Sequence, residues 1–144
     1  MSDLPFTAND LEPNASDKTY GMAAHLACWV PFLPLGLYYV VRNKGSLFKR
    51  FHSMQAMLWQ FMIYFGYVAA WVLALILPCA FLILEPMAWI LAALGPFWAI
   101  YAAFRAFRGH WYLYPLAGWS AQLKLGVPAV LIETSGVKSD TDKG

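Results

Sequence analysis

Long stretches without a charged residue are separated by short clusters of cations, and this pattern predicts a helical membrane protein. Residues 19–41, 51–77 and 87–104 contain no Asp, Glu, Lys or Arg. A helix needs about 20 apolar residues to cross the core of a bilayer. We therefore expect an all-α integral membrane protein with about three transmembrane helices, contained in a domain at residues 19–114.

The first of these stretches is interrupted near its middle. Pro31 and Pro34 each remove a backbone donor and clash with the preceding helical turn, and Gly36 follows closely. Two structures fit this pattern: a kinked transmembrane helix, or a re-entrant helical hairpin that returns to its own side. A re-entrant backbone has to be covered by protein, because lipid offers it no hydrogen bonds.

The second stretch carries polar and small side chains on one helical face. At about 100° per residue, His52 and Gln55 share a side with Gly66. Small residues four apart let another helix approach closely, and polar groups above them can hydrogen-bond across the same interface. The predicted packing positions on this helix are His52, Gln55, Gln60, Gly66, Ala70 and Ala74.

The third stretch repeats the small-residue pattern. Pro78 is expected to end the second helix, residues 79–84 to form an apolar turn, and Glu85 with Pro86 to begin the third helix. We expect a kink at Pro96. The small residues that we expect to pack against the Gly66 face are Ala92, Gly95 and Ala99.

The flanking segments differ from these stretches in composition. Residues 1–18 are acidic and poor in apolar residues, and residues 133–144 are polar, so both are predicted to be disordered tails. Residues 115–132 are apolar but contain Lys124 and Pro128, which disfavour insertion. We interpret them as an interfacial or partner-covered segment rather than a further span.

Cations gather where the apolar stretches end: Arg42, Lys44, Lys49, Arg50, Arg105 and Arg108. The positive-inside rule places these residues in the cytoplasm, where they would also favour anionic lipid. Three spans would put the N-terminus outside and the C-terminus in the cytoplasm, whereas a re-entrant first segment would bring the N-terminus inside. The predicted location is the bacterial inner membrane or an intracytoplasmic membrane derived from it.

The composition agrees with this interpretation and offers little chemistry. Hydrophobic residues make up 60% of the chain and charged residues 12%, whereas a soluble domain carries about 25% charged residues. The three histidines, His25, His52 and His110, are isolated in the sequence, and no nucleophile, metal cluster or phosphate loop accompanies them. We therefore expect no enzymatic activity. His25 or His52 would be the axial ligand if a partner complex contributed a chlorophyll-type pigment, although a hydrogen bond is the commoner role. A quinone held by the partner complex is the other cofactor considered.

Three short motifs resemble those of a known family. They are Gly21-Met-Ala-Ala-His25-Leu, Phe51-His-Ser-Met-Gln-Ala56 and Arg108-Gly-His-Trp-Tyr-Leu-Tyr-Pro-Leu116. Over residues 18–117 the chain is similar to the Tic-twenty-like small membrane proteins. Bacterial members are mostly of unknown function, and plastid members belong to the inner-envelope import translocon, so the resemblance implies a protein-translocation or channel-like assembly.

The residues themselves favour a different role. A small bundle with few charges and two packing faces is suited to be a structural or accessory subunit of a larger membrane complex, such as a photosynthetic or respiratory one. Its expected partners are membrane lipids, other transmembrane subunits or further copies of the chain, and not nucleic acid. A translocation or channel-like assembly is the alternative.

Overall fold

The structure is a computed structural model that describes residues 12–77, 79, 81–114, 117–129 and 131–132. All regular structure in these ranges is helical, as predicted. The elements are α2 (Ala15–Leu26), the 3-10 turn η1 (Ala27–Trp29), α3 (Leu33–Val41), α4 (Leu47–Ile76), α5 (Phe81–Phe107) and α6 (Ala117–Leu125). Two of them, α4 and α5, are long and apolar enough to cross a membrane, whereas three spans were expected.

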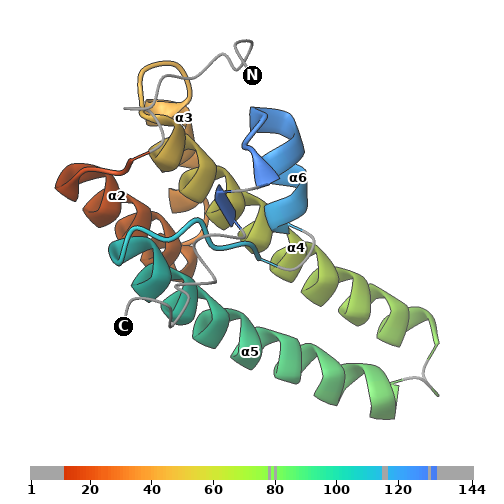
Figure 1. Ribbon diagram of the computed structural model, residues 1–144. Coiled ribbons are helices and arrows are strands. Elements are labelled where there is room, and N and C mark those ends of the chain that lie inside the picture. The colour runs from red at the N-terminus through yellow and green to blue at the C-terminus, as the bar shows by residue number, and fades with distance from the viewer. Residues whose placement is uncertain (1–11, 78, 80, 115–116, 130, 133–144) are drawn as a thin grey trace.

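The two longest helices, α4 and α5, form a hairpin against which the other helices pack (Figure 1). Ser46 caps α4 by accepting a hydrogen bond from the Lys49 backbone N–H. The third helix begins earlier than predicted, at Phe81, so that Pro86 lies inside it. A proline removes one backbone donor, so the carbonyl four residues earlier loses its helical partner. Here that carbonyl belongs to Leu82, an exposed residue in the first turn of α5, and the helix continues through Pro86. The predicted end of α4 at Pro78 lies outside the described residues.

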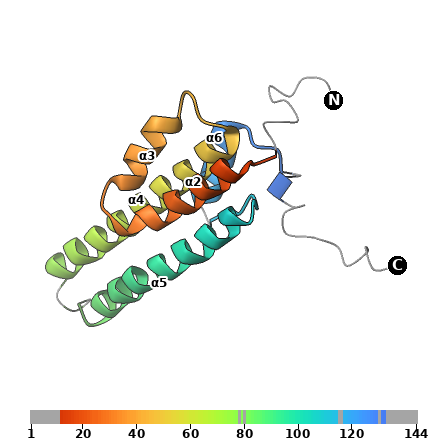
Figure 2. The same cartoon turned by 90° about the vertical axis from the view of Figure 1, so that its left-hand side faces the viewer.

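The first apolar stretch forms a helical hairpin instead of a kinked span. After α2 and η1 the backbone of Phe32 takes a left-handed conformation (φ 62°), and α3 runs back with Pro34 in its first turn. The Gln60 side chain donates to the carbonyls of Cys28 and Val30, at 3.1 and 2.8 Å, which fixes the tip of the hairpin. Gln60 lies about 20 Å along α4, at 1.5 Å per residue. The α2–α3 hairpin therefore covers only part of α4 and α5 (Figure 2).

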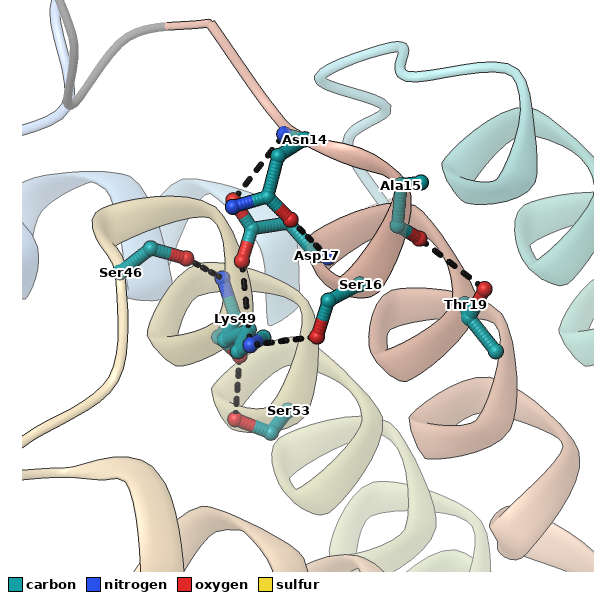
Figure 3. A network of polar contacts seen from close by, with 8 residues as sticks. All are labelled: Asn14, Ala15, Ser16, Asp17, Thr19, Ser46, Lys49 and Ser53. Carbon is teal, nitrogen blue, oxygen red and sulfur yellow. Dashed lines mark hydrogen bonds and ion pairs between the residues drawn. The ribbon is translucent and has the colours of Figure 1, made fainter.

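The beginnings of α2 and α4 are tied together by polar contacts (Figure 3). Asn14 and Asp17 form a capping box at the start of α2, and the Asp17 carboxylate pairs with the Lys49 ammonium at 3.2 Å. Lys49 also donates to the Ser16 hydroxyl at 3.1 Å. The predicted disordered tail at residues 1–18 is therefore too long, because residues 15–18 are already helical; residues 1–11 and 133–144 lie outside the described ranges.

A hydrophobic core fills the end of the hairpin where α4 begins. Phe48 and Phe51 of α4 pack with Trp111, and the same cluster includes Ala121 and Val127 from the C-terminal part of the chain. The helix α6, nine residues long, contributes Ala121. It lies against α4 and is too short to cross a bilayer. Within residues 117–129 one face thus packs against the chain itself, while Trp119 and Leu123 are exposed.

The two predicted packing faces meet in part: Trp59 Nε1 donates to the Gly95 carbonyl, and a Cβ added to Gly95 would collide with the Ile63 side chain of α4. Ala99, Ala102 and Ala106 of α5 are fully buried, and a Cβ added to Gly21 of α2 would lie 3.3 Å from Cβ of Ala106. A Cβ on Gly66, by contrast, would meet no atom within 4 Å. Helical periodicity identifies residues that share a face but not the element that covers it. Here α2 packs against much of the α5 stripe.

A buried polar cluster of His25, His52 and Tyr114

Two histidines from different helices meet in the interior. His25 Nε2 of α2 lies 2.9 Å from His52 Nδ1 of α4, and the rings are nearly perpendicular, at 85°. Both side chains are completely buried. The expectation that the histidines are isolated is wrong for this pair, because the α2 segment folds back along α4 and brings together residues 27 positions apart.

Tyr114 extends the histidine pair to a chain of three groups. Its hydroxyl lies 3.1 Å from Nδ1 of His25, so both nitrogens of His25 are engaged in hydrogen bonds. The phenol ring stacks on Trp59 of α4, with 4.8 Å between the centroids and 6° between the planes. The tyrosine is thus held by its hydroxyl and by its face, and it joins the segment after α5 to both α2 and α4.

The hydrogen bonds of this chain have a preferred direction. We assign the Tyr114 hydroxyl as donor to His25 Nδ1, which leaves the His25 proton on Nε2 to be donated to His52 Nδ1. His52 then keeps its proton on Nε2, which faces the backbone of His110 with a geometry short of a hydrogen bond. In the reverse direction His25 Nδ1 would donate to the Tyr114 oxygen, and the hydroxyl proton of Tyr114 could no longer be donated to His25. All three side chains are neutral in this arrangement.

A glutamine fixes the segment that carries the tyrosine. Residues 110–114, here called the strap, follow α5 without regular structure. Gln55 Nε2 donates to the Tyr112 carbonyl at 3.0 Å, and Gln55 Oε1 accepts from the Tyr114 backbone N–H at 2.9 Å. The amide side chain therefore pairs with the strap as a neighbouring strand would, and it satisfies two buried backbone groups that would be costly to leave unpaired.

In the part of the chain that the structure describes, no carboxylate takes part in the cluster. The acids among the described residues are Glu12, Asp17 and Glu85, of which Asp17 pairs with Lys49 and Glu85 accepts from Trp89 on α5. Burial raises the pKa of the Tyr114 phenol above its usual value of 10.0. A neutral, enclosed group whose side chains hydrogen-bond to one another serves to specify packing.

Below the tip of the α2–α3 hairpin lies a cavity of about 270 Å³ between α4 and α5. Aromatic side chains dominate its walls, and Gln60 and Cys28 also line it. The residues that line it include Trp29, Trp59, Tyr64, Tyr67, Trp89 and Gly95. The cavity belongs to the apolar half of the hairpin and contains no charged side chain among its lining residues.

The structure also places the other residues singled out in the sequence. His52, Gln55 and Gln60 are buried and hydrogen-bond to α2, the strap and η1 respectively. Neither His25 nor His52 offers an exposed nitrogen to a pigment. In the described part of the chain, no group of three His, Cys, Asp or Glu residues could hold a metal ion. Arg42 and Arg108 stack over aromatic rings, at 4.0 and 4.1 Å from the ring centroids.

Sequence reasoning did not identify Tyr114 or Trp59 as members of the cluster. Tyr114 follows a cationic helix end in a run of aromatic residues, which is a position typical of the membrane interface, and no local pattern shows that it is buried. The sequence did contain one signal, because Tyr114 belongs to the third of the three short motifs and His25 and His52 belong to the other two. In the structure all three motifs contribute a side chain to the same buried core.

The fold and the cluster together define a small helical protein that has two helices long and apolar enough to cross a membrane and a polar core closed off from solvent. Residues 16–120 match the model of the magnetosome magnetite crystal formation protein family (MamF/MmsF), and the chain belongs to that family. No match was found among curated proteins or among solved structures.

The resemblance to Tic-twenty-like proteins is wrong, because the matching family is a different one. It rested on three short motifs in a common order. The structure shows that these motifs supply His25, His52 and Tyr114 to one buried core. A packing core of this kind can be encoded by similar short patterns without a shared activity, so the motifs alone do not identify the family.

Proposed function

We propose that this protein is a non-enzymatic component of the magnetosome membrane that acts in the formation of magnetite crystals. The observation that carries the proposal is the family match at residues 16–120, which contains all of α3, α4 and α5 and the whole buried cluster. The role named by the family description is thereby extended to this chain.

A structural role, rather than a catalytic one, is supported by the cluster itself. A catalytic group must reach a substrate, but His25, His52 and Tyr114 are at most 1% exposed and hydrogen-bond to one another. Their hydrogen bonds connect α2, α4 and the strap. We therefore propose that the cluster maintains the shape of the protein and that function resides in its outer surfaces.

The proposed topology is a transmembrane hairpin of α4 and α5 with α2 and α3 re-entering from the cytoplasmic side. The two long helices measure about 45 and 40 Å at 1.5 Å per residue, more than the roughly 30 Å of a bilayer core. The cations at the start of α4 and the end of α5 favour the cytoplasm for that end. Both the start of α2 and the strap then lie on the cytoplasmic side.

The outer faces of the hairpin supply contact surfaces for neighbours in the membrane. Phe65 and Leu75 of α4 are each 77% exposed, and Leu82 of α5 is 81% exposed. We propose that lipids and partner helices cover these faces in an assembly of the magnetosome membrane rather than in a photosynthetic or respiratory complex. The translocation alternative had its basis in the family resemblance that is now corrected.

The proposal is tested by expressing the protein in a magnetosome-forming bacterium from which its own member of the family has been deleted. Electron microscopy measures crystal length, and membrane fractionation verifies that each variant reaches the magnetosome. We expect the unaltered chain to restore crystal size, Gln55→Leu to fail because the strap is released, and Phe65→Leu to succeed. Unchanged crystals in cells whose magnetosomes contain the unaltered protein would contradict the proposal.

A further inference from the structure

Charge is divided sharply between the two ends of the hairpin. All eight Lys and Arg residues in the described part of the chain lie at the end where α4 begins and α5 ends, accompanied by two acids, Glu12 and Asp17. They are Lys18, Arg42, Lys44, Lys49, Arg50, Arg105, Arg108 and Lys124. At the opposite end of the described hairpin the charged residue is Glu85. We call the cationic end the basic end.

The cations of the basic end differ in their surroundings. Lys49 is neutralised by Asp17 at 3.2 Å and donates to Ser16. Arg42 and Lys44, in the connection between α3 and α4, are exposed, and so is Arg108 after α5. Within the described ranges these three side chains form no ion pair with an acid, so their charge is available to a partner.

The geometry of the two exposed arginines indicates the depth at which that partner lies. The Arg42 guanidinium sits 4.0 Å over the ring of Tyr39, and the Arg108 guanidinium sits 4.1 Å over the ring of Phe104. Both rings are themselves at least half exposed. An exposed aromatic ring near a helix end, with a cation above it, is the arrangement found where hydrocarbon gives way to headgroups.

We propose that the basic end binds the headgroups of anionic phospholipids, with Arg42, Lys44 and Arg108 as the contacting cations. Charge complementarity favours an anionic partner, and the positions of the cations favour a lipid over an acidic protein. The cations lie around the ends of two separate helices at the level of exposed aromatic rings, which is where a layer of headgroups would surround the protein. This inference does not depend on the role in crystal formation.

The test uses the full chain reconstituted in vesicles of dioleoyl phosphatidylglycerol and dioleoyl phosphatidylcholine in equal amounts. After mild extraction, native mass spectrometry counts the lipids of each kind that remain bound. We expect phosphatidylglycerol to be retained preferentially, and Arg42→Gln, Lys44→Gln and Arg108→Gln together to lower that preference at least about fivefold, since each cation near the surface contributes about that factor. Glu85→Gln, at the other end, should leave the preference unchanged.

A charge-conserving variant separates charge from shape. Arg42→Lys with Arg108→Lys keeps the cations and should keep the preference, and equal unfolding midpoints in neutral detergent show that the variants are folded. Equal retention of both lipids by the unaltered chain would overturn the proposal and favour an acidic protein partner for the basic end. A preference that survives the triple variant would overturn the assignment of these three residues.

Discussion

His25 and Tyr114 are hydrogen-bonded although they are 89 positions apart in the chain. One belongs to the first helix of the structure and the other to the strap that follows the last long helix. His52, from the middle of the chain, completes the group. The polar cluster therefore joins three segments that no local sequence pattern connects. Its hydrogen bonds hold α2, α4 and the strap together.

The stability losses from replacing the two histidines of the pair should not be additive. We expect His25→Leu or His52→Leu to lower the free energy of unfolding by about 1–3 kcal/mol, because each leaves a buried polar group unpaired. The double variant should lose less than the sum of the two. Thermal unfolding in detergent, followed by circular dichroism, gives the coupling. Leu26→Ala, at an exposed neighbouring position, is the control, and strictly additive losses would contradict a direct interaction.

Gln55→Leu should release the strap while leaving the helices formed. The substitution removes the acceptor of the Tyr114 backbone N–H and the donor to the Tyr112 carbonyl, at a cost of about 1–3 kcal/mol for the buried groups left unpaired. Hydrogen exchange resolved by mass spectrometry should show faster exchange at residues 110–114. Gln122→Leu is a matched control, since Gln122 also donates to a backbone carbonyl, at Val127, but within the α6 region. Equal protection of the strap in both variants would show that Gln55 does not hold it.

Two glycine-to-alanine substitutions should act in opposite directions. A Cβ on Gly118 would lie 2.9 Å from both Cα of Leu113 and Oε1 of Gln55, so Gly118→Ala should displace the strap and destabilise the protein by about 1–3 kcal/mol. Gly66→Ala meets open space and should stabilise α4 by up to about 1 kcal/mol through helix propensity. Unfolding midpoints of the two variants check this, and a loss at Gly66 would indicate contact with another molecule there.

Stability should fall on the alkaline side because of Tyr114. Burial raises the pKa of this phenol above 10.0, so the folded state holds the proton more tightly than the unfolded state. The contribution is fully present below about pH 10 and is lost as the pH rises above that value. Unfolding midpoints measured between pH 8 and 11 should decline for the unaltered protein and decline less for Tyr114→Phe. Identical slopes for the two proteins would exclude Tyr114 as the source.

The sequence allowed the helical class and the main apolar helices to be predicted, because unbroken apolar runs and cation clusters are local features. The break in residues 19–41 was also visible, but the choice between a kink and a hairpin depended on Gln60, whose bonds to Cys28 and Val30 hold the tip. The small stripe of α5 could be recognised, whereas its coverage by Gly21 of α2 could not. Periodicity describes one helix at a time, and the packing of three helices is a property of their surfaces together.

The site illustrates the same difference. His52, Gln55 and Gln60 were placed on a packing face by their spacing, and in the structure each bonds a different element. Their partners lie in segments whose position depends on the whole fold, so pairing with His25 and Tyr114 could not be inferred. A run of aromatic residues after a cationic helix end is typical of a membrane interface, and this local interpretation concealed the buried role of Tyr114.

The long separation between His25 and Tyr114 has a consequence for biosynthesis. The α2–α3 hairpin is made first, yet a hydrogen-bond partner of its buried histidine is made only after α5 has been completed. Contacts between residues far apart in the sequence carry a large loop-closure entropy and slow folding. We therefore expect the N-terminal hairpin to reach its final packing only after the strap has been synthesised. Chains truncated before residue 110 should leave His25 without its Tyr114 partner and should be more sensitive to proteolysis.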